Sequence, residues 1–322
     1  MSNAEQLWAT RYIMIGLDLP LWGDGLAFLS AAVVIGLAGI RLAGYADRLA
    51  DRTGLGEAVT GTVMLGLITA LPGLAASVTA ALQGHAVLAL SNAMGGIAFQ
   101  TTVLAVADIT HRKANLEHAA ASATNMMQTI MLILLMTLVL AGLSGPDVVI
   151  GHLHPATMVL FGAAAMAFWL TYQVRERPMW KPLKTAETVP DEPAPGSHRE
   201  SLWKLWTGLI VAGAITLVSG SLVAEASANI ADKTGISASI IGGLLMAGAT
   251  SLPELVTCIA AVRRGALTLA VSDVVGGNFF DVLFVAAADL AFVSGSLYHG
   301  EGVGNREVFL TALTILLNVV LL

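Results

Sequence analysis

Apolar stretches about as long as a bilayer is thick recur along this chain and leave few folds open to it. A helix needs about 20 apolar residues to span the hydrocarbon core of a membrane. Nine runs approach or exceed that length: 24–43, 56–82, 85–109, 119–143, 151–173, 203–224, 237–262, 266–292 and 307–322. Only 12% of the residues are charged, against roughly a quarter in soluble domains. The sequence therefore predicts an all-α polytopic membrane protein embedded in a lipid bilayer.

One polar segment interrupts the apolar runs. Between Arg175 and Lys204 the chain holds five of its ten prolines, and such a composition cannot bury a core. We therefore expect a first membrane repeat at residues 1–173, a Pro-rich linker at 174–204 and a second membrane repeat at 205–322. The residues before the first run lack the pattern of a cleavable signal peptide, and we interpret them as an interfacial lead-in.

The basic residues are distributed unevenly between the two sides of the predicted membrane. Thirteen of the 16 Lys and Arg fall on the side of the linker, and three fall on the other side. Cytoplasmic loops carry the excess of positive charge. The distribution predicts a bacterial inner-membrane protein with a cytoplasmic linker and its N-terminus outside.

Some classes of partner and site are excluded by composition. A net charge of −6 gives no basic stripe, so we expect no nucleic-acid partner. The single cysteine, Cys258, excludes an intrachain disulfide framework and lies in an apolar run, which is typical of a small buried residue. We find no metalloprotease or nucleophile–base motif, so we do not expect an enzyme or a tightly bound cofactor.

An internal repeat relates the two halves. A shift of 181 positions aligns Thr53–Ile109 with Thr234–Leu290 without a gap, and 18 of the 57 positions are identical. The matches include Leu-Pro, a paired glycine and an Asp, which coincide by chance far less often than Ala or Leu. Five predicted spans precede the second half, an odd number, so the two copies enter the membrane from opposite sides. Inverted repeats of about five helices are a recurring plan of secondary transporters, with the ion site near the membrane midplane.

Two prolines lie deep within predicted spans, and they occupy equivalent positions of the repeat. Pro72 and Pro253 each free a backbone carbonyl four residues earlier, which in lipid needs another partner. A simple helix kink is the commoner reason for such a proline. The neighbours of Pro253, which are Thr250, Ser251 and Glu254, favour a cation site instead, because hard cations bind carbonyl, hydroxyl and carboxylate oxygens.

The acidic residues of the second half are the strongest functional signal. A carboxylate near the bilayer centre costs at least a few kcal/mol and commonly marks an ion pathway. Glu254 is one such residue, and Asp281 follows in the next predicted helix, just after Gly276, Gly277 and Asn278. The paired glycines allow helices to approach closely, so we expect the two carboxylates to share one site. Asp273 lies eight residues earlier and is a candidate for the access path.

These motifs resemble those of the sodium/calcium exchanger superfamily. GATSLPEL (248–255) followed by VVGGNFFDVL (274–283) is similar to its second alpha repeat, at 234–290 here, and LITALPGL (67–74) with AMGGIAFQ (93–100) is similar to a degenerate first alpha repeat, at 53–109. The resemblance implies ten helices in two inverted sets of five. It also implies a central site for sodium and calcium, with the following ligands: Thr250, Ser251, Glu254, Asp281, Thr69 and Gln100. Further candidates for the site, apart from these ligands, are Asn278, Pro72 and Pro253.

The chain departs from the family pattern at several positions. The family has Glu where this chain has Gly73, Ser where it has Ala70, often Ser at Gly96 and Gly277, and Asn at Ile97. Fewer fixed charges imply fewer, or less highly charged, ions held at once. The final run ends with the chain, so the tenth helix of the family plan is absent or truncated in this sequence.

Two functions remain open at this point. The first is an antiporter that exchanges Na⁺ or H⁺ against Ca²⁺ or another cation. The second is a cation-binding membrane sensor or partner subunit that does not transport. The sequence does not decide the transported ion, the stoichiometry or the oligomeric state.

Overall fold

The structure is a computed structural model that describes residues 19–53, 66–110, 123–176, 201–264 and 267–322. Within these ranges all the regular structure is helical apart from one isolated bridge between Ile150 and Leu153. The prediction of an all-α protein is confirmed. Most of the predicted linker, from residue 177 to residue 200, lies outside the described residues, so the three-part division of the chain stays a prediction.

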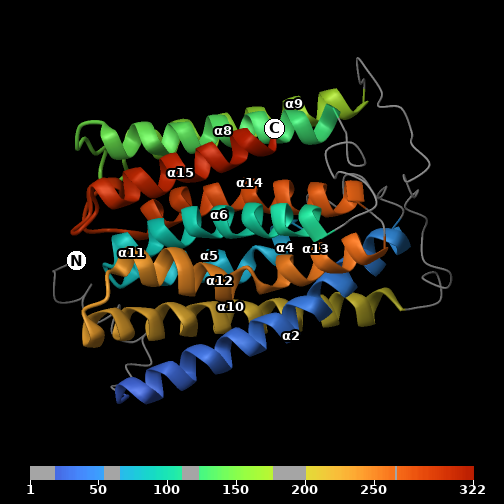
Figure 1. Cartoon of the computed structure of the whole chain (residues 1–322), viewed down its shortest axis with the longest axis horizontal. Helices are drawn as coiled ribbons and strands as arrows, with labels where there is room; N and C mark the ends of the chain where they lie inside the picture. Colours follow the sequence, from blue (N-terminus) through green and yellow to red (C-terminus); the bar gives the residue numbers. More distant parts are fainter. Residues whose placement is uncertain (1–18, 54–65, 111–122, 177–200, 265–266) are drawn as a thin grey trace.

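Two sets of helices make up the molecule (Figure 1). The helices before the linker are α2 (Leu21–Thr53), α4 (Gly66–Thr69), α5 (Leu71–Leu82), α6 (Ala86–Thr110), α8 (Ala123–Ser144) and α9 (Pro155–Glu176). The helices after it are α10 (Leu202–Thr234), α11 (Ala238–Ile240), the π-helix η3 (Ile241–Met246), α12 (Ala247–Thr250), α13 (Leu252–Arg264), α14 (Leu267–Ala291), the 3₁₀ turn η4 (Leu297–His299) and α15 (Asn305–Leu321).

Most of the predicted spans appear as helices of suitable length. Six described helices are long and apolar enough to cross a membrane, and a seventh span results if the bent pair 238–250 and 252–260 counts as one. These correspond to seven of the nine predicted runs. The run 56–82 is described only from residue 66 and includes the shorter apolar helix α5, and α15 covers 17 residues of the last run.

The helix boundaries reproduce the offset found in the sequence. The bounds of α2, α4 and α6 become those of α10, α12 and α14 when 181 is added to each residue number. Helices α2 and α10 run in opposite directions, because Lys233 near the end of α10 contacts Asp24 near the start of α2. Antiparallel packing of equivalent helices is the arrangement that inverted repeats predict.

Helices α6 and α14 form the centre of the molecule. Their most apolar windows are 72% and 78% buried, whereas those of the other spanning helices are 22–44% buried. In Figure 1 they lie between a layer of α8, α9 and α15 and a layer that contains α5, α12 and α13, with α10 and α2 beyond it. Polar side chains carried on the inner faces of α6 and α14 are therefore shielded from lipid.

The two prolines mark helix breaks in both halves. Helix α4 ends at Thr69 and α5 begins at Leu71, while α12 ends at Thr250 and α13 begins at Leu252 after a bend of 49°. In each case a proline is the second residue of the new helix, and its missing N–H leaves the carbonyl oxygen four residues earlier without its helical partner. The helices are therefore interrupted at both Pro72 and Pro253, and the 49° bend is at Pro253.

Equivalent glycines seat α2 and α10 against these breaks. A Cβ atom on Gly39 of α2 would lie 2.4 Å from Cγ of Pro253, and one on Gly220 of α10 would lie 2.3 Å from the carbonyl oxygen of Pro72. Residue 39 becomes residue 220 under the same shift of 181. Each long helix thus packs against the broken helix of the other half.

An ion pair joins the start of α2 to the end of α10 and gives a first prediction. The carboxylate of Asp24 is almost fully buried and accepts hydrogen bonds from Lys233 Nζ at 2.8 Å and Asn229 Nδ2 at 3.1 Å. Lys233→Met removes the charged partner of that carboxylate, so we expect the free energy of unfolding to fall by about 1–3 kcal/mol. This is less than for a deeply buried ion pair, because Lys233 is 31% exposed. Thermal unfolding in detergent measures the loss. Asp24→Asn/Lys233→Met, which removes both charges, is expected to recover most of it, and an unchanged melting temperature in Lys233→Met would contradict the prediction.

Candidate functional site

A buried cavity lies where the two helix breaks meet the two central helices. It is enclosed by side chains from α5, α6, α13 and α14 and from the breaks themselves. The described lining residues are Ala70, Gly73, Asn92, Gly96, Gln100, Thr250, Ser251, Glu254, Asp281 and Phe284. Five of the six residues expected to bind a cation therefore surround one space.

The second break places three of these residues. Thr250 is the last residue of α12, Ser251 lies at the bend with φ −89° and ψ 9°, and Glu254 lies in the first turn of α13. The first turn of a helix carries the positive end of its dipole, which favours a carboxylate there. Proline fixes the start of α13, so the break both frees backbone oxygens and directs Glu254 inward.

The central helices supply the other charged group and its partner. Gln100 Nε2 on α6 donates to Asp281 Oδ2 on α14 at 2.8 Å and to Ser251 Oγ at 3.3 Å. Gln100 and Asp281 are equivalent positions of the repeat, since 100 plus 181 is 281. The pseudo-symmetry axis that relates the two halves therefore passes close to this hydrogen bond.

The described lining of the cavity holds two acidic side chains and no basic side chain to pair with them. Glu254 is 2% exposed and Asp281 is 3% exposed, and Glu254 lies within electrostatic reach of Asp281. None of the described lining residues is basic. Within the part of the chain that the structure describes, Glu254 Oε2 and Gln100 Oε1 are buried without a hydrogen-bond partner. Buried acceptors of this kind are costly unless something binds them, and a cation offsets both the charge and the missing bonds.

Two glycines border the charged part of the cavity. A Cβ atom on Gly96 would lie 3.2 Å from Asp281 Oδ2, and one on Gly277 would lie 3.3 Å from Gln100 Oε1. Neither position leaves an ordinary van der Waals distance for a larger side chain beside these oxygens. The glycines therefore keep the space next to the oxygens open.

Asn92 lines the cavity but was not among the ligand candidates. Its Nδ2 donates to Ser77 Oγ at 2.8 Å and to the carbonyl oxygen of Gly73 at 3.2 Å, and Thr250 Oγ1 donates to its Oδ1 at 3.3 Å. In the sequence Asn92 was visible only as the repeat counterpart of Asp273. Its position one helical turn before Gly96 was the available signal that it faces the same side of α6.

Three other candidates lie outside the lining. Thr69 Oγ1 donates to the carbonyl oxygen of Gly66 at 3.3 Å and also interacts with Glu254. Asn278 Nδ2 donates to Thr101 Oγ1 at 3.2 Å, a bond between α14 and α6. Asp273 Oδ2 accepts from Thr257 Oγ1 at 2.6 Å. Their roles in binding or access remain predictions.

The position of Asp273 gives a second prediction. Because its carboxylate does not line the cavity, Asp273→Asn is expected to weaken cation binding by less than about tenfold, through its electrostatic interaction with Glu254 alone. Radiotracer Ca²⁺ binding to purified protein in detergent measures the change. A loss as large as that of a cavity carboxylate would place Asp273 among the ligands.

Asp289 has a different role near the C-terminal end of α14. It is fully buried, and its carboxylate accepts from the backbone N–H of His154 at 3.0 Å, that of Leu297 at 2.8 Å and Thr157 Oγ1 at 2.6 Å. Asp289 is therefore not solvated. The residue instead fixes two loops to the helix end.

The same pattern of helices and motifs is found in known proteins. A sequence model of the family described as "Sodium/calcium exchanger protein" matches residues 25–175 and 204–322. These segments take in both sets of helices and leave out most of the linker.

Curated relatives match over different lengths. The putative antiporter CaxA of Alkalimonas amylolytica is 26% identical over 314 residues, which cover 97% of this chain and 89% of the relative. The inner membrane protein YrbG of Escherichia coli (strain K12) is 32% identical over 93 residues, or 29% of this chain and 28% of the relative. The sodium/calcium exchanger MaX1 of Methanosarcina acetivorans is 30% identical over 103 residues, or 32% and 28%.

A solved structure has the same fold. The sodium-calcium exchanger NCX_Mj soaked with Na⁺ and Sr²⁺ superposes with a TM-score of 0.60 at 19% identity, covering 94% of this chain and 90% of that one. The likeness extends over both halves of the molecule and the helices between which the cavity lies.

Proposed function

Because the chain belongs to the sodium/calcium exchanger family, we propose that it is a cation antiporter that exchanges Na⁺ or H⁺ against Ca²⁺ or another cation by alternating access. The exchange takes place across a bacterial inner membrane. CaxA, which aligns with 97% of the chain, is a putative antiporter from a bacterium, and this similarity supports both parts of the proposal.

One observation carries the proposal. Two carboxylates, Glu254 and Asp281, face a closed space at the centre of the molecule, and no basic residue is among the described residues around it. Such an arrangement stores uncompensated negative charge at the place where a cation is most strongly attracted. Hydroxyl and amide oxygens complete a set of hard ligands that suits Ca²⁺ and Na⁺, and protons compete for the same carboxylates.

The symmetry of the helices supports alternating access. The broken helices of the two halves meet at the cavity, and each is seated against a long helix of the opposite half. Halves of opposite orientation exchange shapes with little change in their internal packing, which opens a central site first to one side and then to the other. The cation itself is cargo in this scheme.

Membrane orientation follows the distribution of basic residues. We assign the linker to the cytoplasm and the N-terminus to the outside, since 13 of the 16 Lys and Arg lie on the linker side. The orientation assigns the helix ends that carry Asp24 and Lys233 to the outer face.

Flux in proteoliposomes tests the function. Vesicles loaded with Na⁺, or held at an acidic internal pH, are diluted into radiotracer Ca²⁺, and uptake is followed with and without an ionophore that dissipates the gradient. We expect uptake that depends on one of the two gradients, and that gradient identifies the coupling ion. Binding of Ca²⁺ by folded protein that gives no flux under either gradient would contradict antiport and favour the sensor.

A further inference from the structure

The two ends of the cavity differ although the repeat makes their positions equivalent. Glu254 of the second half corresponds to Gly73 of the first, and Phe284 corresponds to Val103, since 73 and 103 plus 181 give 254 and 284. At the second-half end of the cavity, Glu254 is therefore paired with Val103 of α6. At the first-half end, Gly73 is paired with Phe284 of α14.

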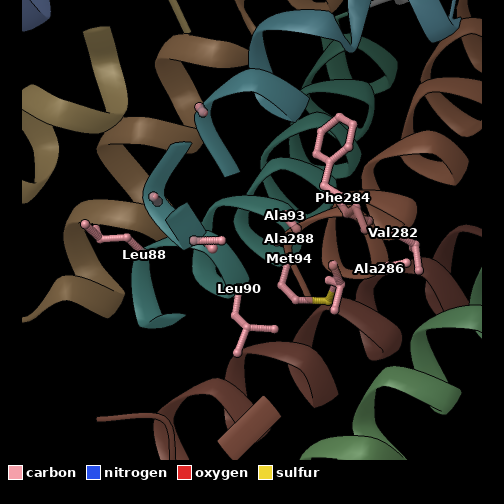
Figure 2. Packing of buried hydrophobic residues seen from close by; sticks show 14 of the residues in the cluster. Leu88, Leu90, Ala93, Met94, Val282, Phe284, Ala286 and Ala288 are labelled. Atoms are coloured by element: carbon pink, nitrogen blue, oxygen red, sulfur yellow. The ribbon is translucent and has the colours of Figure 1, made fainter. Parts of the chain in front are cut away.

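The aromatic ring occupies the space that a side chain at position 73 needs. A Cβ atom on Gly73 would lie 2.7 Å from Cε2 and 3.3 Å from Cζ of Phe284. Figure 2 shows the ring pointing away from Val282 and Ala286, which lie on the opposite side of the same helix. Phe284 is 5% exposed and lines the cavity, so the ring stands as an apolar wall beside Gly73.

The equivalent pair in the other half is arranged in the complementary way. Val103 and Glu254 both line a second small pocket next to the cavity, together with Phe99, Leu255 and Cys258. A small side chain at position 103 accompanies a carboxylate at position 254, whereas a large ring at 284 accompanies a glycine at 73. One pair therefore has a carboxylate and a small side chain, and the other has a large ring and no second side chain.

Hydrogen bonding differs between the two ends in the same sense. Near Gly73, the amide of Asn92 satisfies the carbonyl oxygen of Gly73 and the hydroxyl of Ser77. Near Glu254, the buried Glu254 Oε2 and Gln100 Oε1 have no partner among the described residues. On the described lining, the side-chain oxygens still available to a cation are therefore those of Glu254 and Gln100.

From this asymmetry we propose that the cavity binds a single cation between Glu254, Asp281 and Gln100, and that Phe284 with Gly73 excludes a second ion from the first-repeat half. The proposal deepens the function above and rests on the same cavity being the cation site. Phe284 is then a residue that determines ion number and selectivity, although it offers no ligand atom.

Equilibrium binding to purified protein in detergent tests the proposal. Radiotracer Ca²⁺ is titrated alone and then displaced with Na⁺, which gives the number of Ca²⁺ per chain and the Hill coefficient of Na⁺. We expect one Ca²⁺ and a Hill coefficient close to 1 for the unmodified protein. A Na⁺ Hill coefficient near 2 or above, more than one Ca²⁺ per chain, or no saturable binding at all would overturn the proposal.

A double substitution gives the first half the composition of the second. In Gly73→Glu/Phe284→Val the ring is removed and a carboxylate is added, so we expect the Na⁺ Hill coefficient to rise toward 2 and Ca²⁺ to bind about tenfold or more tightly. Gly73→Glu alone retains the clash with the ring and is expected to lower the yield of folded protein. If the double variant is monodisperse and its ion binding is unchanged, Phe284 does not determine ion number. If the double variant does not fold, the number of ions bound by the unmodified protein tests the proposal.

Phe279→Val is the matched control. It shortens another buried aromatic residue of α14, whose ring packs on Phe168 with centroids 4.5 Å apart and does not line the cavity. We expect a lower melting temperature without a change in ion number. Binding is measured in detergent and flux in liposomes, so the two hypotheses can fail separately. A protein that binds one ion and gives no flux would overturn only the antiport function. A protein that transports and binds two Na⁺ would overturn only this inference.

Discussion

Glu254→Gln is expected to abolish cation flux and to weaken Ca²⁺ binding by about a hundredfold or more, while the protein remains folded in the membrane. Glutamine keeps the length of the side chain and one carbonyl oxygen, so the packing around the cavity is retained. The substitution replaces one of the two carboxyl groups among the described lining residues. In a buried site the attraction between one charge and a cation is worth several kcal/mol, and a hundredfold change corresponds to about 2.7 kcal/mol.

Binding and flux are measured on the same preparation of this variant. Glu301→Gln is the matched control, because it makes the same change at an exposed position in the loop between η4 and α15. The control is expected to bind and transport like the unmodified protein. Full transport by Glu254→Gln in liposomes that contain normal amounts of folded protein would remove Glu254 from the transport mechanism.

Gly95→Ala is expected to give the largest loss of stability among single small substitutions. A Cβ atom at this position in α6 would lie 2.2 Å from the carbonyl oxygen of Gly243 and 2.5 Å from its Cα atom. Both atoms belong to the backbone of η3, so relief requires α6 and η3 to move apart. Overpacking of this kind costs about 1–3 kcal/mol or more, and we expect a melting temperature in detergent that is several degrees lower, or little folded protein.

Gly162→Ala separates this contact from the intrinsic effect of the substitution. Gly162 lies within α9, and a Cβ atom there would have no neighbour within 4 Å. Alanine favours a helix over glycine by about 0.5–1 kcal/mol, so this variant is expected to be neutral or slightly stabilised. Similar melting temperatures for the two variants would contradict the close approach of α6 and η3.

The features predicted from the sequence are those that follow from local chemistry or from the repeat. Apolar length gave the helices, and proline gave the two breaks, because both act over a few residues. Glu254 and Asp281 were recognised because carboxylates inside apolar spans are rare. Gln100 was carried over from the family resemblance, and the repeat placed it opposite Asp281, with which it forms a hydrogen bond.

What the sequence did not predict depends on contacts between distant segments. Phe284 is unremarkable in an apolar helix, and its role follows from the absence of a side chain at Gly73, more than 200 positions earlier. The paired glycines had been expected to bring α13 and α14 together around the site. Gly277 does lie against α13, because a Cβ atom there would be 3.8 Å from Glu254 Cγ. In addition, Gly95 faces Gly243, and Gly276 and Gly277 face Gly66, so that each pair also contacts the broken helix of the other half.

Asp273 shows the limit of reasoning from helical periodicity. Its spacing of eight residues from Asp281 turns α14 by about 80°, and the sequence predicted for it a place on the access path. That angle is enough to direct its carboxylate to Thr257 rather than into the cavity. The hydrogen bond to α13 was not readable from the sequence.

The central claim is that the cavity between the two breaks holds the transported cation. The most direct measurement is the anomalous difference map of crystals soaked in Sr²⁺, a heavier cation with the ligand preferences of Ca²⁺. We predict one strong peak bounded by Glu254, Asp281 and Gln100, on the side of the cavity away from Phe284, and no such peak in Glu254→Gln. A peak beside Asp273 or elsewhere in the molecule, with the cavity empty at saturating Sr²⁺, would contradict the account.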